Sequence, residues 1–442
     1  MEVMRDHLER IERVNPELNA IVSLRDPGEL LAEAGERDAE LARGESRGWM
    51  HGFPHAIKDL EDTAGIPSVA GSPLLRDNVP GTDSPLVARI KAAGAIVIGK
   101  TNVPELGFGA QTYNPVFGPT RNPYDRSRTP GGSSGGAAAA LAAGLLPVAD
   151  GSDYLGSLRN PAAFCNVFGF RPSIGRVAAV PTTAAFLPAT GTAGAMGRSP
   201  GDVARLMATI AGPAPELPFS IQEDPAAFAE PLRPLAGASV AWLGDLGGHL
   251  PMEPGILEVC ERALEDSPFT VEAAEPGFDP EAVWRATITL RHFDATWLLD
   301  LDLDRVKPEL RYEAEGATAV TGPDVFRAQA VRTELFEALR ALLDQHDFVA
   351  LPSAQAFPFD VDTHWPQEIA GRQMDTYHRW MEVVTYASLA GLPAISVPAG
   401  FRDGLPMGLQ LIGRPRGDLA VLRAAHAYDE ATRWVQRCPP PR

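Results

Sequence analysis

Residues 129–136 read Thr-Pro-Gly-Gly-Ser-Ser-Gly-Gly and lead directly into the apolar stretch Ala137–Leu145. A segment rich in glycine and serine is most often a flexible linker. A linker would not run straight into an apolar helix, however, because that helix would order the glycines. A phosphate-binding P-loop is excluded, since the Gly-Lys-Ser/Thr ending is missing. The remaining interpretation is a tight turn that presents a serine hydroxyl at the N-terminus of a helix.

Outward from this turn, short apolar strands alternate with helical segments. The pattern predicts strands at residues 53–60, 94–99, 239–243, 348–351, 394–397 and 408–412. It predicts helices at residues 6–15, 84–93, 326–343 and 418–434. Ser84 is the expected N-cap of the second of these helices, with Pro85 in its first turn. Strands that alternate with helices indicate an α/β fold with a mixed, largely parallel sheet.

Composition and charge indicate a globular protein that does not bind nucleic acid. The 442 residues carry a net charge of −18 at pH 7, and no local basic patch is present. The longest apolar stretch, 137–149, is shorter than the roughly 20 residues that span a bilayer. No signal peptide is visible, and Cys165, Cys260 and Cys438 lack metal-ligand spacing and fit a reducing compartment. We therefore expect a cytoplasmic protein with no membrane partner and no metal.

Lysine is rare in this chain. Of the 39 basic residues only four are lysines, namely Lys58, Lys91, Lys100 and Lys307. Arginine stays charged in proteins, whereas a buried lysine can lose its proton and act as a base. Lys58 follows an apolar stretch and is the candidate for such a role. Lys91 is expected to be a solvated helix residue, and Lys100 a structural one.

Three segments in a fixed order resemble the amidase signature family. Lys58 ends Gly-Phe-Pro-His-Ala-Ile-Lys, Ser133 follows 75 residues later in the glycine-rich turn, and Ser157 lies a further 24 residues on in Gly-Ser-Leu-Arg-Asn-Pro-Ala. Further matches to the family lie at residues 99–102, 169–172, 175–177, 389–394 and 404–410. The resemblance covers most of the chain except about residues 215–350. It implies the amidase-signature fold, in which a large mixed, mostly parallel β-sheet core is covered by helices on both faces.

The resemblance also implies the roles of the serines and the lysine. Ser157 would be the nucleophile, Lys58 the general base and then acid, and Ser133 the hydroxyl that relays the proton between them. The family holds this bridging serine after a cis peptide bond, which would here join Gly132 and Ser133. Ser134 is the competing candidate for the bridge. The interval of 24 residues favours Ser133, with Ser134 hydrogen-bonding in support.

The oxyanion hole would come from the residues immediately before the nucleophile. By resemblance, backbone N–H groups of Tyr154, Leu155 and Gly156 would form it, and Arg159 of the same motif would support the site. This chain departs from the family's usual Gly-Gly-Ser, because Leu155 stands where the first glycine is expected. If the loop needs a positive φ there, leucine costs about 1 kcal/mol or more. Alternatively, the Leu155 side chain would narrow the acyl side of the substrate pocket.

A lysine that accepts a proton at neutral pH must be largely neutral. Its unperturbed pKa is about 10.4, so burial must lower the pKa of Lys58 by several units. An ion pair with Asp59 would act in the opposite direction. Neighbouring strand residues point to opposite faces, so no direct pair is expected. His51 and His55 flank Lys58 in the sequence and are interpreted as structural, while a Ser–Lys arrangement is a known variant of the serine triad.

These features predict an amidase that hydrolyses a carboxylic amide to an acid and an amine or ammonia through an acyl-enzyme on Ser157, without cofactor or metal. The alternatives are the glutaminase-type subunit of a tRNA-dependent amidotransferase and, because of Leu155, a non-catalytic family member. The expected partner is a small-molecule amide, and a homodimer is left open. Tyr377, Trp380 and Met381 share one helix face and are interpreted as core packing rather than as an aromatic wall of the pocket.

The resemblance implies a single amidase-signature domain over residues 1–442. Family motifs are concentrated at about 50–200 and 380–430, and a variable segment on the substrate side is expected at about 215–370. Relatives carry an extra helical segment before the helix predicted at residues 6–15, whereas this chain begins almost inside that helix.

Overall fold

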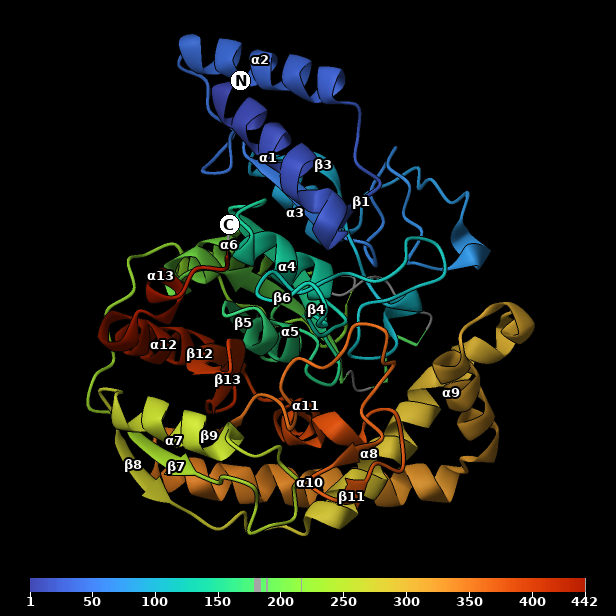
Figure 1. The fold of residues 1–442 in the computed structure, drawn as a ribbon, viewed down its shortest axis with the longest axis vertical. Helices are drawn as coiled ribbons and strands as arrows, with labels where there is room; N and C mark the ends of the chain where they lie inside the picture. Colours follow the sequence, from blue (N-terminus) through green and yellow to red (C-terminus); the bar gives the residue numbers. More distant parts are fainter. Residues whose placement is uncertain (179–183, 188–189, 216, 442) are drawn as a thin grey trace.

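A mixed β-sheet of eight strands forms the centre of the part of the chain that the structure describes (Figure 1). The structure is a computed structural model, and it describes residues 1–178, 184–187, 190–215 and 217–441. The strands of this sheet are β4 (Val148–Asp153), β5 (Phe168–Arg171), β6 (Thr192–Gly197), β7 (Ser239–Trp242), β8 (Thr270–Ala273), β9 (Phe348–Pro352), β12 (Ala394–Arg402) and β13 (Leu405–Ile412). Their order across the sheet is β4-β6-β5-β12-β13-β9-β7-β8.

Most neighbouring strands run antiparallel, which corrects the expectation of a mostly parallel sheet. Of the seven pairings within this eight-stranded sheet, five are antiparallel, and only those of β7 with β8 and β9 are parallel. The strands β12 and β13 form a hairpin through Asp403 and Gly404, whose φ angles of 52° and 81° suit a two-residue antiparallel turn. The alternation of strands and helices along the chain therefore predicted a mixed sheet, but not the directions of its strands.

A small three-stranded sheet carries Lys58. β2 (Pro54–Lys58) lies parallel to β3 (Ile96–Thr101), and β1 (Ile21–Val22) pairs antiparallel with β3. The crossover from β2 to β3 contains α3 (Pro85–Ala92), where the N–H of Val87 donates to the Ser84 side chain at 3.4 Å and so confirms the predicted N-cap. Lys58 is the last residue of β2, which also contacts β4 of the large sheet.

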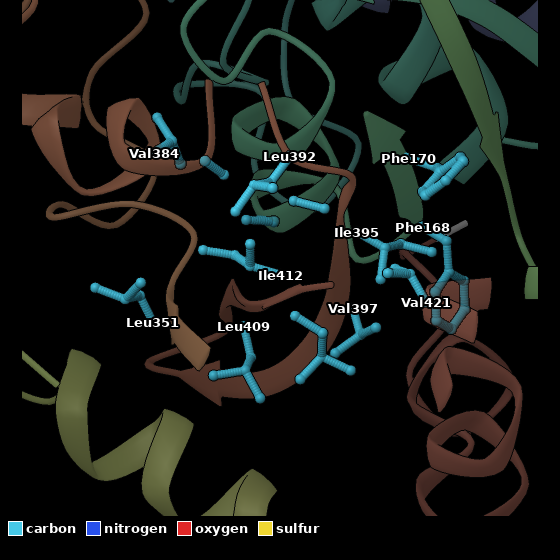
Figure 2. Packing of buried hydrophobic residues seen from close by; sticks show 14 of the residues in the cluster. Phe168, Phe170, Leu351, Val384, Leu392, Ile395, Val397, Leu409, Ile412 and Val421 are labelled. Carbon is cyan, nitrogen blue, oxygen red and sulfur yellow. The ribbon is translucent and has the colours of Figure 1, made fainter. Parts of the chain in front are cut away.

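Helices cover both faces of the large sheet. Nearly every residue of the central strands β9, β12 and β13 is buried, which requires cover on both faces. Figure 2 shows the apolar side chains around β12 and β13, among them Ile395, Val397, Leu409 and Ile412. The other helices are α1 (Glu2–Leu18), α2 (Pro27–Ala42), α4 (Gly135–Ala142), α5 (Arg159–Phe164), α6 (Pro200–Ile210), α7 (Ile256–Glu265), α8 (Pro280–Asp294), α9 (Pro308–Ala319), α10 (Gly322–Gln345), α11 (Thr385–Ala390), α12 (Asp418–Thr432) and α13 (Trp434–Arg437). None of the helices in the described ranges is both long and apolar enough to cross a bilayer.

The glycine- and serine-rich turn is pressed against neighbouring segments where it enters α4. A Cβ on Gly135 would lie 2.2 Å from Oγ1 of Thr112, and one on Gly136 would lie 2.3 Å from the backbone nitrogen of Asn102. Both distances are far shorter than van der Waals contact, so only glycine fits at these two positions. The rest of α4 consists mainly of buried alanines. The segment is therefore an ordered turn and helix, as predicted, and not a linker.

Candidate active site

Lys58 is buried among three serine hydroxyls. Its Nζ lies 2.9 Å from Oγ of Ser133, 2.8 Å from Oγ of Ser134 and 2.9 Å from Oγ of Ser152. The carbonyl oxygen of Ser152 is 3.3 Å away. Only 1% of the lysine is exposed. Ser133 and Ser134 were expected at the site from the sequence, whereas Ser152 was not, because a serine in a strand gives no local sign of what it contacts.

Burial lowers the pKa of Lys58 to about 7. At that pKa about half of the amine is neutral at neutral pH. Among the described residues, Lys58 forms no ion pair with a carboxylate. The neighbouring Asp59 lies 4.0 Å from Nζ of Lys100 instead. The predicted separation of Lys58 from Asp59 is therefore confirmed.

Ser133 follows a cis peptide bond from Gly132, as the resemblance implied. The backbone there is closely surrounded, because a Cβ on Gly132 would lie 3.0 Å from Oγ1 of Thr112 and 3.0 Å from the carbonyl carbon of Ala110. The side chain of Ser133 is 3% exposed, and α4 begins two residues later. The turn before α4 therefore presents the Ser133 hydroxyl to Lys58.

Ser157 lies in the turn between β4 and α5. Gly156, just before it, has a φ of 89°, and a Cβ at this position would lie 2.3 Å from Cγ2 of Val384. Leu155 is not among the described residues with a positive φ, and its side chain packs in the apolar core away from the cavity described below. Leu155 therefore neither strains the backbone through a positive φ nor narrows the pocket, the two effects considered from the sequence.

Asp153 holds the loop that carries Ser157. Its carboxylate accepts hydrogen bonds from the N–H groups of Gly156 at 2.8 Å and Leu158 at 3.2 Å. It also pairs at 3.1 Å with Arg159 and at 3.1 Å with Arg171, and all three charged side chains are fully buried. Burial alone would raise the pKa of Asp153, but the two guanidinium groups hold this pKa well below its usual range. Arg159 therefore contacts the loop through Asp153, which was not among the residues predicted for the site.

The backbone N–H groups of this loop are not equivalent. The N–H of Gly156 donates to Asp153 and is therefore directed away from a substrate. Within the described ranges, the N–H groups of Tyr154, Leu155 and Ser157 have no acceptor. Of the three groups expected in the oxyanion hole, two remain free to donate.

A cavity of about 210 Å³ opens beside the serines. Ser133, Ser152 and Ser157 all line it. The remaining lining residues are Leu60, Leu106, Gly107, Phe108, Tyr154, Arg291, Asp294, Ala295 and Trp297. The last four of these belong to the end of α8 and the short 3-10 helix that follows it (Ala295–Asp300). None of these four residues was expected from the sequence.

The hydroxyls of Ser133 and Ser157 face the same cavity, but no hydrogen bond joins them in the described part of the chain. The N–H of Ser134 donates to the carbonyl oxygen of Ser157 at 3.2 Å and so ties the two turns together. Lys58, Ser133 and Ser157 therefore lie around one space. The hydroxyls of Ser133 and Ser157 are not hydrogen-bonded to each other in this structure. Hydrogen bonds between catalytic groups are often long before a substrate binds.

His51 and His55 make structural contacts, as predicted. Nε2 of His55 lies 3.0 Å from Oδ1 of Asp150, whose Oδ2 accepts the backbone N–H of Lys58 at 3.1 Å. Nε2 of His51 lies 2.9 Å from the carbonyl oxygen of Arg37. Over the residues that the structure describes, no group of three or more histidine, cysteine, aspartate or glutamate side chains is arranged to hold a metal ion.

Other residues that the sequence singled out contribute to packing and surface contacts. Tyr377, Trp380 and Met381 are buried and do not line the cavity, which agrees with their interpretation as core residues. Lys91 is partly exposed and pairs with a carboxylate at 2.7 Å. Lys100 is buried, and its Nζ donates to the loop that follows β2. These two lysines match the structural roles expected for them.

Known proteins resemble this chain over nearly its whole length. The family model Amidase matches residues 2–422. The acylamidase of Rhodococcus erythropolis is 34% identical over 453 residues, which cover 99% of this chain and 93% of that protein. One of the subunits of the Glutamyl-tRNA(Gln) amidotransferase of Thermus thermophilus is 36% identical over 466 residues, which cover 98% of this chain and 94% of that protein. The crystal structure of a bacterial aryl acylamidase of the amidase signature family superposes with a TM-score of 0.90 at 29% identity, covering 100% of this chain and 95% of that one.

These matches extend far beyond the glycine- and serine-rich turn. They include the strands of the large mixed sheet and the helices that cover it. They confirm the predicted amidase-signature fold. The chain therefore belongs to the Amidase (amidase signature) family and is an amidohydrolase that acts on carbon–nitrogen amide bonds.

Proposed function

We propose that this amidohydrolase cleaves a carboxylic amide to an acid and an amine or ammonia through an acyl-enzyme on Ser157. The observation that carries the proposal is the distance of 2.9 Å between Nζ of the buried Lys58 and Oγ of Ser133, beside a cavity that Ser157 also lines. A serine hydroxyl needs a neighbouring base before it can attack a carbonyl. A lysine with a pKa of about 7 suits that task at neutral pH.

The proposed reaction has two halves that use the same proton relay. In the first half, the Ser157 proton passes to Ser133 while the Ser133 proton passes to Nζ of Lys58, and Oγ of Ser157 bonds to the amide carbon. The Lys58 ammonium then returns a proton through Ser133 to the amide nitrogen, the carbon–nitrogen bond breaks and the amine leaves. In the second half, water attacks the resulting ester through the same relay and releases the acid and free Ser157.

The oxyanion that forms on the amide carbonyl needs donors that are not already engaged. We assign this task to the backbone N–H groups of Tyr154 and Leu155, which have no acceptor in the described residues. The role that we assign to Gly156 is to adopt the positive φ that the loop requires, because its N–H donates to the Asp153 carboxylate and is not available to the oxyanion. Removing one donor from an oxyanion hole typically lowers kcat by about 10²–10³-fold.

The second candidate is a glutaminase-type subunit that passes ammonia to a partner. It is favoured by the 36% identity to the amidotransferase protein of Thermus thermophilus and by Arg291 and Asp294, two charged residues in the cavity. The third candidate, a non-catalytic family member, rested on Leu155 alone. Leu155 has no positive φ and packs in the core, so this support is removed.

Activity of the isolated chain separates these candidates. The protein, dialysed against EDTA, is incubated with aliphatic, aryl and peptide amides and with glutamine, and the products are identified by mass spectrometry. We expect hydrolysis of a simple amide without a partner and without loss on chelation, because the proposed steps use only serine, lysine and backbone groups. Release of ammonia from glutamine only after amidotransferase partner subunits are added would favour the second candidate. Full activity in Ser157→Ala would refute the acyl-enzyme.

We also propose that residues 1–442 work as a single domain, in which the segment of about 215–370 forms the substrate side of the site. The supporting observation is that Arg291, Asp294, Ala295 and Trp297 line the same cavity as the motif serines. A cavity of about 210 Å³ suits a small-molecule amide as the binding partner.

A further inference from the structure

The cavity beside the serines contains two charged side chains that are not paired with each other. Arg291 and Asp294 stand three residues apart at the end of α8, so the helix directs both to one face. Both line the cavity. In the described residues no ion pair joins them, since the guanidinium of Arg291 pairs with Glu313 instead.

Arg291 is held firmly and still leaves one nitrogen free. Its Nε donates to Glu313 at 2.9 Å, and its Nη2 donates to the hydroxyl of Tyr377 at 3.4 Å. The guanidinium carbon lies 4.3 Å from the ring centre of Phe108 and 4.7 Å from that of Tyr154, a cation–π arrangement on two rings. Nη1 has no hydrogen-bond partner among the described residues. The orientation of Arg291 is therefore fixed, and Nη1 remains able to donate.

Asp294 is held in a similar way and leaves one oxygen free. Its Oδ2 accepts the hydrogen bond of the Tyr154 hydroxyl. Its Oδ1 has no donor among the residues that the structure describes. This oxygen and Nη1 of Arg291 are not fully enclosed by protein atoms, and both residues line the cavity. The cavity wall thus offers one free donor group and one free acceptor close together.

The charges around these two residues are already balanced. Glu313 is the counter-ion of Arg291 at 2.9 Å, and the positive charges of Arg291 and, more weakly, Arg332 act on Asp294. A ligand group with a net charge would therefore enter the cavity without a counter-ion, which is unfavourable in a partly dry site. A neutral group that both accepts and donates hydrogen bonds is complementary to the free Nη1 of Arg291 and the free Oδ1 of Asp294.

On the basis of the proposed amidase activity, we propose that Arg291 and Asp294 select amides that carry a second, neutral carboxamide group. The carbonyl oxygen of that group accepts from Nη1 of Arg291, and its N–H donates to Oδ1 of Asp294. The cavity volume of about 210 Å³ equals that of about seven water molecules, which accommodates a short diamide. A substrate without the second carboxamide leaves both polar atoms unpaired once water is displaced, and sites of this kind discriminate strongly against such analogues.

The test compares matched substrates on the intact enzyme. Succinamide, glutaramide and adipamide are each assayed against the monoamide of the same chain length, and glutamine is included as an amide that carries a charged ammonium and a charged carboxylate. We expect kcat/KM for the best diamide to exceed that for its monoamide and for glutamine by at least about tenfold. Equal rates for diamide and monoamide, or a preference for glutamine, would overturn the inference.

Variants at Asp294 test whether Arg291 and Asp294 in the cavity wall cause the expected preference for diamides. Asp294→Ala should lower the ratio of diamide to monoamide kcat/KM toward one, and Asp294→Asn, which retains a carbonyl acceptor, should keep more of that ratio. Asp300→Asn is the matched control, because Asp300 is exposed in the 3-10 helix after α8, and the ratio should not change. An unchanged ratio in both Asp294 variants would overturn the inference even if amide hydrolysis persists. An enzyme that hydrolyses no amide would refute the proposed function itself.

Discussion

The Oγ of Ser152 lies 2.9 Å from Nζ of Lys58, so a third hydroxyl completes the surroundings of this amine beside those of Ser133 and Ser134. A neutral amine has two N–H donors and one lone pair. For the lone pair to accept the proton of Ser133, the two N–H groups must point to the other two serines. In the proposed mechanism, Ser134 and Ser152 therefore orient Lys58.

The first prediction concerns Ser152. We expect Ser152→Ala to lower kcat by about three- to tenfold, because losing one hydrogen bond of about 0.5–1.5 kcal/mol leaves the amine free to rotate. Lys58→Ala, which removes the proposed base, should lower kcat by about 10²–10⁴-fold. Ser46→Ala, at an exposed position, serves as the control in the same steady-state assay and should match the parent. A Ser152→Ala enzyme with the parent's kcat would show that other groups orient the lysine.

The second prediction concerns pH. Lys58 accepts a proton only in its neutral form, and its pKa is lowered to about 7 by burial. We therefore expect kcat/KM to level off above that pH and to fall about tenfold per pH unit well below it. Burial also raises the pKa of Glu61 to about 7, so the same profile is measured for Glu61→Gln. A profile that is flat across neutral pH, or a limb that disappears in Glu61→Gln, would assign the titration to a group other than Lys58.

The third prediction concerns Gly156, the glycine before the proposed nucleophile Ser157. Gly156 and Gly44 have φ angles of 89° and 79°, so alanine is strained by about 1 kcal/mol at either position. Only at Gly156 does the added Cβ meet another atom, Cγ2 of Val384 at 2.3 Å, whereas nothing lies within 4 Å at Gly44. Gly156→Ala should lower the free energy of unfolding by a further 1–3 kcal/mol or so relative to Gly44→Ala, measured by urea denaturation, and should also lower kcat. Two variants of equal stability and full activity would mean that the loop adapts to the methyl group.

Parts of the site that depend on a few neighbouring residues could be predicted from the sequence. A strand at residues 53–60 and the cap of α3 by Ser84 were both expected, and both are present, although β2 is shorter than predicted and ends at Lys58. The cis bond before Ser133 followed from the family resemblance. Each of these features is decided by a short segment, either by its side-chain pattern or by a motif.

Features that depend on distant segments could not be predicted in this way. Arg291 and Asp294 reach the cavity from the end of α8, far along the chain from the serines. Their spacing is that of any two residues on one helix face, and nothing in the local sequence distinguishes a face that lines a cavity from one that meets solvent. The prediction of mostly parallel strands was wrong for a related reason. The alternation of helices and strands along the chain does not determine which strands become neighbours in the sheet.

The end of the first helix shows how a local rule can also fail. The helix was expected to end at Asn15, before Pro16, but α1 continues to Leu18 and contains the proline. Asn19 sets the end instead, because it adopts a φ of 52° and its N–H donates to the carbonyl oxygen of Asn15 at 2.7 Å. A proline near the end of a helix is tolerated where the chain beyond it is capped in this way.

Covalent labelling of the active enzyme determines which serine forms the proposed acyl-enzyme. A serine-directed fluorophosphonate is reacted with the intact protein, residual amidase activity is followed, and the modified peptide is identified by mass spectrometry. We expect one adduct per chain, on Ser157, with activity lost in proportion to labelling and with slower labelling in Lys58→Ala. An adduct on Ser133, Ser134 or Ser152 instead of Ser157, or an enzyme that stays fully active while Ser157 is modified, would contradict it.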